Sequence, residues 1–370
     1  MNDRRIFMLA FNERIIRGLN NNQSNQTRDR RISMKQIKEQ KMRIVLSILL
    51  ITMIFPPAWA QTRAALADVE KPKIVCVTAD RFYIVEESCV IRAYSRKDNT
   101  SLKIFGKKGQ GPGEFAEFPY MKPLETELFV SSPGKISIFS FEGRLREEKK
   151  TLTDLWKVTM EPAGERFVTK KMVQRPDKKG IYFEECVYLY DKDFVNKKLL
   201  YSVFVGKEGQ KISFLPSRIS FHVDKNRIFV AETDKGMVIE VFDLTGNPIG
   251  RINGTYEKRK IDKVFKQERE EKFTRDGTDK NYFEWPDYYP AMSSFFVDNE
   301  RIWVETYNRN RDNIEFILFD LKGKELKKIF LPDGNELYAF YKDFYYCLKY
   351  SLLKETWEWL TVSLAGGLNK

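Results

Sequence analysis

The sequence predicts an all-β protein, folded as a six-bladed β-propeller between residues 61 and 370. A strand-and-turn unit recurs six times, apolar and polar residues alternate within its strands, and Phe and Tyr are abundant, with 28 and 17 copies in 370 residues. Aromatic and β-branched side chains suit pleated, half-buried strands. A unit of about 40 to 45 residues matches a four-stranded propeller blade.

The two clearest copies of the unit run from Val223 to Asn247 and from Val297 to Lys324. Each reads as a polar turn, a short aromatic and β-branched strand, a second polar turn, and a strand that ends in Phe-Asp-Leu-x-Gly. Asp in this motif accepts hydrogen bonds from the turn's own backbone, and Gly takes the positive φ that the turn requires. We therefore assign these residues to the scaffold.

Four weaker copies complete the set, beginning near residues 80, 126, 164 and 342. The equivalent strand anchors of the six copies are Val85, Val130, Val168, Val230, Val304 and Tyr346. The longer intervals predict inserted loops at Met172–Gly180 and Tyr256–Tyr289. We expect an N-terminal strand near Ile74–Thr78 to close the ring by pairing with the last blade around Phe344–Leu364, which would remove exposed strand edges.

One segment departs from the β pattern. Lys258–Lys272 places Ile261, Val264, Phe265 and Glu268 at helical spacing among many charged residues. This spacing predicts a short amphipathic helix across one face of the propeller. A solvated charged loop is the alternative.

Residues 42–60 have the layout of a secretory signal peptide. Basic residues precede an apolar run at Ile44–Phe55, and two prolines lead to a small-x-small cleavage motif at Ala58 and Ala60. The run is shorter than the roughly 20 residues that cross a membrane, and no Cys follows it to carry a lipid. We expect an exported, periplasmic or extracellular protein without stable membrane insertion after cleavage; an uncleaved anchor is the alternative.

Residues 1–41 are polar and lack hydrophobic periodicity, so we interpret them as disordered or as lying upstream of a true start at Met34 or Met42. The formal charge of +12 is uneven. The first sixty residues hold 11 basic and 4 acidic side chains and carry +7, which leaves +5 for the rest. Because the basic residues of the remainder alternate with acidic ones, we expect no nucleic-acid binding.

The segment Phe105–Phe115 reads Phe-Gly-Lys-Lys-Gly-Gln-Gly-Pro-Gly-Glu-Phe. It resembles the segment that closes the first blade in bacterial exported six-bladed propellers of the NHL-repeat and TolB-like type, and the repeat spacing extends the resemblance over roughly Lys71–Leu364. The resemblance implies the fold and a location outside the cytoplasm, and it implies no activity. A phosphate-binding loop is excluded because no Gly-Lys-Ser or Gly-Lys-Thr follows the glycines.

The chain has one histidine, His222, which argues against a multi-histidine zinc site or a Ser-His-Asp triad. We predict a structural role for His222 and no catalytic residue. The cysteines, Cys76, Cys89, Cys186 and Cys347, form no Cys-x-x-Cys pair, and they are either disulfide-bonded or buried thiols.

The function that we predict is non-catalytic binding of a protein or carbohydrate by a monomer that carries no cofactor. The candidate ligand-binding residues are Glu114, Phe115, Trp285, Tyr288 and Tyr289. Aromatic residues in loops supply large contact areas at a small entropy cost. Filling the gap between two blades is the alternative role of the Trp285–Pro290 loop.

The alternative function is a calcium-dependent hydrolase or lactonase of the gluconolactonase or strictosidine-synthase-like type. Its calcium ligands would be oxygens, and the candidates are Asp224, Asn226, Asp298 and Asn299. These residues also stand in the turns of the repeat, where forming the turn is the competing role.

Overall fold

The computed structural model describes residues 61–151, 159–177, 180–215, 218–275, 283–310, 312–334 and 337–364. The predicted signal peptide and the 41 residues before it lie outside these ranges. Among the described residues, no helix is both long enough and apolar enough to cross a membrane.

The described residues form six four-stranded antiparallel sheets, each the size of one propeller blade. Blade 1 contains β2 (Pro72–Val77), β3 (Arg81–Glu86), β4 (Ile91–Ser95) and β5 (Ser101–Phe105); blade 2 contains β6 (Tyr120–Pro123), β7 (Glu127–Ser132), β8 (Lys135–Ser140) and β9 (Leu145–Lys150); blade 3 contains β10 (Thr159–Ala163), β11 (Arg166–Asp177), β12 (Gly180–Tyr190) and β13 (Lys197–Lys207). Blade 4 contains β15 (Ile219–Asp224), β16 (Arg227–Glu232), β17 (Val238–Asp243) and β18 (Pro248–Asn253); blade 5 contains β20 (Ser294–Asp298), β21 (Arg301–Asn310), β22 (Asn313–Asp320) and β23 (Glu325–Pro332); blade 6 contains β24 (Tyr338–Tyr341), β25 (Phe344–Ser351), β26 (Thr356–Ser363) and β1 (Gln61–Leu66).

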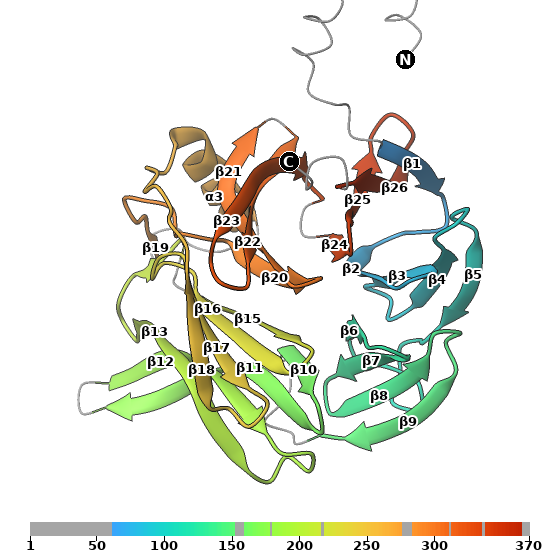
Figure 1. Ribbon diagram of the computed structural model, residues 1–370, viewed down its shortest axis with the longest axis horizontal. Coiled ribbons are helices and arrows are strands. Elements are labelled where there is room, and N and C mark those ends of the chain that lie inside the picture. The colour runs from blue at the N-terminus through green and yellow to red at the C-terminus, as the bar shows by residue number, and fades with distance from the viewer. Residues whose placement is uncertain are drawn as a thin grey trace, which may run out of the picture. The chain divides into compact units, whose positions relative to one another are not determined.

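The blades are arranged as a closed ring (Figure 1). Their first strands contact one another in a complete cycle, β2 to β6, β10, β15, β20, β24 and back to β2. Each of the six predicted anchor residues lies on the second strand of its blade. The prediction of a six-bladed propeller is therefore confirmed.

The strand that closes the ring differs from the one predicted. β1 pairs antiparallel with β26, from Gln61 opposite Val362 to Leu66 opposite Trp357, and so completes blade 6 from the N-terminal end of the domain. Of residues Ile74–Thr78, which we expected in this role, all but Thr78 belong to β2, the innermost strand of blade 1. The closing strand reads Gln-Thr-Arg-Ala-Ala-Leu, with almost none of the β-branched and aromatic residues that mark the other strands.

The predicted loop at Met172–Gly180 is also wrong, because the strands of blade 3 continue through most of it. β11 and β12 pair from Phe167 opposite Tyr190 out to Asp177 opposite Gly180. Arg175 on β11 forms an ion pair of 3.1 Å with Glu184 on β12. Such cross-strand charge pairs support a solvated hairpin, so polar composition alone does not indicate a loop here.

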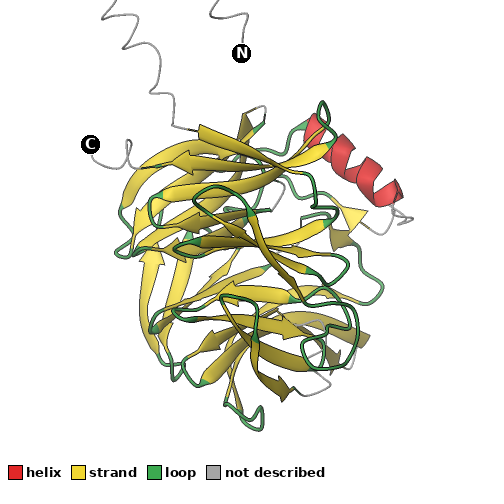
Figure 2. Ribbon diagram, turned by 90° about the vertical axis from the view of Figure 1, so that its right-hand side faces the viewer, coloured by secondary structure: helices red, strands yellow, loops and turns green. Residues whose placement is uncertain are grey.

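The predicted helix is present as α3 (Lys263–Arg275), which lies at one side of the strands in Figure 2. It begins five residues later than expected, because Asp262 is its N-cap: the Asp262 side chain accepts a hydrogen bond of 2.8 Å from the Phe265 amide. Ile261, predicted in the helix, lies before its first residue, and both Ile261 and Phe265 pack against Tyr289 in a small apolar cluster. Val264 does not, since 65% of its surface is exposed.

Turn chemistry follows the repeat. Asp243 accepts hydrogen bonds from the Thr245 hydroxyl at 2.7 Å and from the amides of Asn247 and Thr245 at 2.9 and 2.8 Å, and these bonds lower the pKa of its carboxyl to about 2. Gly246 in the same turn has a φ of +79°. The Phe-Asp-Leu-x-Gly motif therefore belongs to the scaffold.

All four cysteines are buried as free thiols, so of the two states expected for them the structure shows the second.

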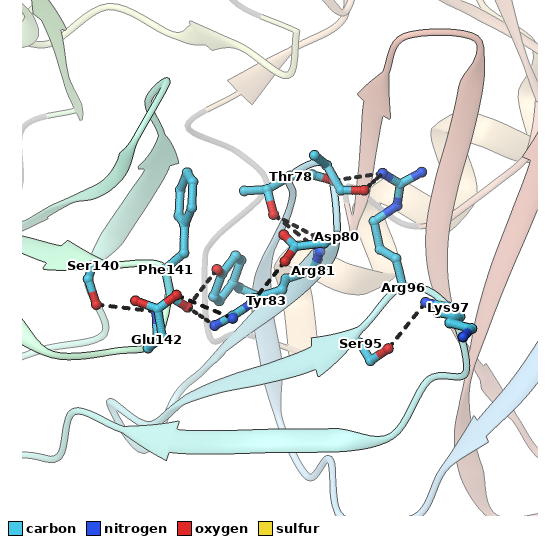
Figure 3. Close-up of polar contacts among 11 residues, drawn as sticks. Thr78, Asp80, Arg81, Tyr83, Ser95, Arg96, Lys97, Ser140, Phe141 and Glu142 are labelled. Atoms are coloured by element: carbon cyan, nitrogen blue, oxygen red, sulfur yellow. Dashed lines mark hydrogen bonds and ion pairs between the residues drawn. The ribbon is translucent and has the colours of Figure 1, made fainter.

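Polar contacts connect blade 1 to blade 2 (Figure 3). Arg81 and Tyr83 on β3 donate hydrogen bonds of 2.7 and 2.9 Å to the carbonyl oxygen of Phe141. Arg81 also lies 3.3 Å from Glu142. The second strand of one blade is thus fixed to a turn of the next.

A second set of contacts joins blade 1 to blade 6, where the ring closes. Arg96 donates a hydrogen bond to the Tyr346 hydroxyl, and its guanidinium lies over the rings of Tyr341 and Tyr346 at 5.0 and 5.2 Å. The latter contacts are cation–π interactions. Arg96 therefore supports ring closure beside the β1–β26 pairing.

Candidate functional site: the central channel

The first strands of all six blades surround a central channel of about 980 Å³. In β15, Ile219, Phe221 and Val223 are buried in the blades, whereas the alternate residues are half-buried. Successive side chains of a strand point to opposite sides, so the alternate residues face the channel. The sequence pattern of the inner strands therefore decides the chemistry of the channel wall.

The pairing register of the first two strands is the same in all six blades. In each blade, one residue of the inner strand pairs with the third residue of the second strand, so these six residues lie at the same level of the channel. This ring consists of Cys76, Lys122, Glu161, His222, Phe296 and Ala339. Its ionisable members Lys122, Glu161 and His222 come from three consecutive blades. The single histidine thus lies beside an acid and a base.

Glu161 is the centre of a buried hydrogen-bond network and is 3% exposed. Its carboxylate accepts bonds from the Tyr120 hydroxyl at 3.1 Å, from the Val223 amide at 2.8 Å, and from the Lys122 ammonium. Lys122 also donates to the Val223 carbonyl. The ion pair thereby satisfies both backbone groups of Val223 at the open edge of β15.

A second ion pair does the same at the other end of β15. Glu185 accepts a hydrogen bond from the Ile219 amide, Lys170 donates one of 2.9 Å to the Ile219 carbonyl, and the two charged groups lie 3.7 Å apart. β15 is therefore held against blade 3 through side chains at both ends. These charges stabilise the junction between the blades.

His222 is neutral in this setting. Its Nδ1 lies 3.7 Å from a Glu161 oxygen. Burial, followed by the nearby Lys122 charge, lowers the pKa of His222 to about 4, although Glu161 acts in the opposite direction. Burial acts to raise the pKa of Glu161, but the charge of Lys122 and the hydrogen bonds from Lys122 and the Val223 amide outweigh it, and the carboxyl stays ionised with a lowered pKa.

Asp224 and Asp298 lie at one end of the channel, as the last residues of neighbouring inner strands. Burial and the charge of Asp224 together raise the pKa of Asp298 to about 6, against a hydrogen bond from the Lys342 amide that lowers it. One oxygen of Asp298, Oδ2, is buried with no hydrogen-bond partner. The two carboxyl groups therefore repel each other at this mouth.

The structure brings together two of the four residues predicted for calcium. Asn226 and Asn299 are exposed in the turns that follow Asp224 and Asp298, and neither lines the channel. Over the described ranges, no three His, Cys, Asp or Glu side chains gather where they could hold a metal ion. Because calcium takes six to eight oxygen ligands, this donor set is incomplete.

Of the residues predicted to bind a ligand, Glu114 and Phe115 lie between blades 1 and 2. Phe115 is fully buried and packs against Phe139. Glu114 accepts a hydrogen bond of 2.9 Å from the Gly111 amide and pairs with Lys107 at 2.9 Å. Both side chains therefore hold the glycine-rich turn.

The other three predicted residues lie between blades 4 and 5, and none lines the channel. Trp285 stacks on Phe214 at 4.4 Å and donates a hydrogen bond of 2.7 Å to Glu270 of α3. Tyr289 is 6% exposed, and Tyr288 is 40% exposed. The loop thus anchors α3 and offers Tyr288 to solvent.

Sequence reasoning missed the channel residues Lys122 and Glu161. Aligning the six inner strands residue by residue could have found them, since they then stand level with His222. That alignment needs the register of each hairpin, which β6 and β10 hide because they are short and contain Pro123 and Pro162.

Comparison with known proteins adds little. No family model matches the chain, and no curated protein matches it significantly. Among solved structures, the RRP9 WD40 repeats match with a TM-score of 0.44 and 8% identity over 81% of this chain and 97% of that one. Chaetomium thermophilum Raptor matches with a TM-score of 0.42 and 12% identity, over 92% of this chain and 33% of that one. The computationally designed Ika8 protein matches with a TM-score of 0.38 and 8% identity, over 81% of this chain and 98% of that one.

The fold is established by the order and pairing of the sheets. The chain is a six-bladed β-propeller.

Proposed function

We propose that this propeller binds a protein or carbohydrate ligand outside the cytoplasm without transforming it, and that the ligand enters the central channel. The observation that carries the proposal is the channel itself, about 980 Å³ in volume and lined by all six blades. Ligand sites are concave, of about 300 to 1,000 Å³, and have a few placed polar groups.

The channel's acid and base groups favour binding over catalysis. Glu161 is surrounded by three hydrogen-bond donors, and Lys122 is bound to Glu161 and to a backbone carbonyl. A general acid or base must reach a proton of the substrate. These groups instead hold β15 in place.

Export is part of the proposal and rests on the predicted signal peptide. Cleavage after Ala60 would leave the closing strand intact, because β1 starts at Gln61. We expect the full chain, expressed in a bacterium with a periplasm, to yield a periplasmic protein whose N-terminal sequencing starts at Gln61. A membrane-bound product that retains residues 42–60 would favour the anchor instead.

The channel is tested by blocking it. The periplasmic protein is screened on a glycan array and in pull-downs from cell-envelope extracts, and each hit is titrated against Ser220→Trp, which places an indole in the channel. Ser101→Trp on the exposed outer strand β5 is the matched control. We expect Ser220→Trp to weaken binding by about tenfold or more and the control to bind normally. Equal binding by both variants would contradict the channel as the site.

A calcium-assisted hydrolase is the second candidate, favoured only by the unpartnered Oδ2 of Asp298 beside Asp224. A bound divalent cation would relieve the repulsion between the two carboxylates. A calcium-dependent rise in melting temperature that is lost in Asp298→Asn would support this candidate. Identical melting with calcium and with chelator would count against it.

A further inference from the structure

A second cavity, of about 490 Å³, lies between blade 5 and the segment that links blades 4 and 5. We call it the side pocket. Its wall includes Tyr256, Lys258, Arg259, Lys260, Tyr307 and Lys328. Four basic side chains line it against two acidic ones, Glu257 and Glu315.

The backbone of the side pocket is fixed. The Gly254 amide donates a hydrogen bond of 2.7 Å to the Met237 carbonyl, and the Tyr289 amide donates one of 2.9 Å to the Arg259 carbonyl. A Cβ atom at Gly254 would lie 2.7 Å from Met237 and 2.8 Å from Phe319. Only glycine allows this approach, so the linking segment is held in place before any ligand arrives.

Two basic residues of the side pocket, Lys258 and Lys260, have no acidic partner among the residues that the structure describes. A third basic residue, Arg259, does have one: its guanidinium lies 3.9 Å from the Asp262 carboxylate, and it donates a hydrogen bond of 2.6 Å to the Asn308 side chain. Lys258 and Lys260 are exposed, and no described acidic group lies within 4.0 Å of either ammonium. The Lys258 ammonium lies 5.8 Å from the centroid of the half-exposed Tyr288 ring, a contact that leaves its charge uncompensated. The positive charge of the two lysines is therefore available to a ligand.

The acids of the side pocket compete little for that charge. The Glu315 carboxylate accepts a hydrogen bond of 2.9 Å from the Thr306 hydroxyl. The Lys328 ammonium lies 3.9 Å from the carboxylate of Glu325, and Glu325 is not part of the pocket wall. Glu257 is exposed to solvent, where water weakens its field.

Aromatic rings form the rest of the wall. Tyr307 stacks on Tyr289 with ring centroids 5.1 Å apart and an angle of 19°. Tyr256 packs against the core cluster of blades 4 and 5. Rigid tyrosines offer apolar faces and hydroxyl groups at low entropy cost. Such walls suit a ring-shaped, hydroxylated ligand better than a bare ion.

We infer that the side pocket binds an anionic sugar, whose ring lies against Tyr256 and Tyr307 and whose sulfate or carboxylate is held by Lys258 and Lys260. This site is separate from the central channel and does not depend on ligand binding there.

The test is calorimetric titration of the full-length gene product, purified after export, with four probes at low salt. The probes are a heparin-derived sulfated disaccharide, its desulfated counterpart, trigalacturonate, and sodium sulfate. The test variant is Lys258→Gln/Lys260→Gln. Lys322→Gln/Lys324→Gln is the matched control, since it removes two exposed lysines from the turn between β22 and β23 of blade 5.

We expect the sulfated disaccharide or trigalacturonate to bind at least about tenfold more tightly than both the desulfated sugar and sodium sulfate. Lys258→Gln/Lys260→Gln should remove this preference, and the control should keep it. Ser220→Trp should also keep it, which separates this site from the channel. No binding of either anionic sugar, equal binding of sodium sulfate, or equal losses in both lysine variants would overturn the inference.

Discussion

The central channel and the side pocket each have four basic side chains in their walls, yet they use them differently. In the channel, Lys122 and Lys170 each pair with a glutamate and donate to a backbone carbonyl of β15. In the side pocket, Lys258 and Lys260 have no acidic partner among the described residues. The difference indicates that the first set of charges holds blades together and that the second is available to a ligand.

Burial explains this division. The side chains of Glu161 and Lys122 are 4% and 15% exposed, and an isolated charge in such a place is costly. Lys258 and Lys260 are exposed, so water stabilises them without a partner. Variants that remove charges from one cavity at a time test whether the two sets of charges differ in this way.

The largest effect is expected for Glu161→Gln. The change leaves Lys122 buried without its counter-charge, which costs about 3 to 5 kcal/mol of unfolding free energy. Urea unfolding at neutral pH measures the loss, with Glu257→Gln in the side pocket as the control. A loss below about 1 kcal/mol, typical of exposed pairs, would show that the channel charges are not structural.

His222 should make stability depend on pH. Its pKa is lowered from 6.5 to about 4 in the folded protein, so the unfolded chain binds more protons between these values. Stability from this group is present above pH 6.5 and is lost as pH falls toward 4, by about 2 to 3 kcal/mol. The loss should be missing in His222→Asn, as measured by urea unfolding from pH 4 to 7. Parallel pH profiles of the two proteins would contradict the buried, neutral imidazole.

Asp298 should act in the opposite direction. Its pKa is raised to about 6 from 3.8, so the folded protein binds the extra proton, and stability falls as pH rises from about 4 to 6. After allowance for partial exposure, the change is about 1 to 2 kcal/mol. The stability difference between the parent and Asp298→Asn should therefore shift with pH in this window. A constant difference would place Asp298 in a solvated environment.

The smallest effect is expected in the side pocket. Lys258→Gln/Lys260→Gln should change the unfolding free energy by less than about 0.5 kcal/mol, because neither lysine is buried or paired. Thermal melting at neutral pH is sufficient to measure this. A loss of several kcal/mol would mean that these lysines hold the linking segment and are not free for a ligand.

The blades could be predicted from the sequence because their signals are local. Turn residues such as Asp243 and Gly246 and the aromatic strands between the turns mark each unit without knowledge of the fold. The closing strand could not be found this way, since Gln61–Leu66 has little strand character and is stabilised by pairing with β26. Likewise, β11 continues through Pro176 because β12 pairs with it.

The candidate site was harder to predict for a different reason. Aromatic residues in loops suggest contact with a ligand, but Phe115 and Tyr289 are buried by the packing that aromatic side chains favour. The channel residues Lys122, Glu161 and His222 are 39 and 61 residues apart in the chain. Only the register of three hairpins brings them to one level.

A double-mutant cycle on Lys122 and Glu161 tests the central claim most directly. Lys122→Met, Glu161→Leu and the double variant are compared with the parent by urea unfolding. The account predicts that each single change is strongly destabilising and that the double variant is more stable than their sum by about 2 to 3 kcal/mol. Additive losses would mean that the buried pair does not act as a unit, which would contradict the assignment of the channel charges to the fold.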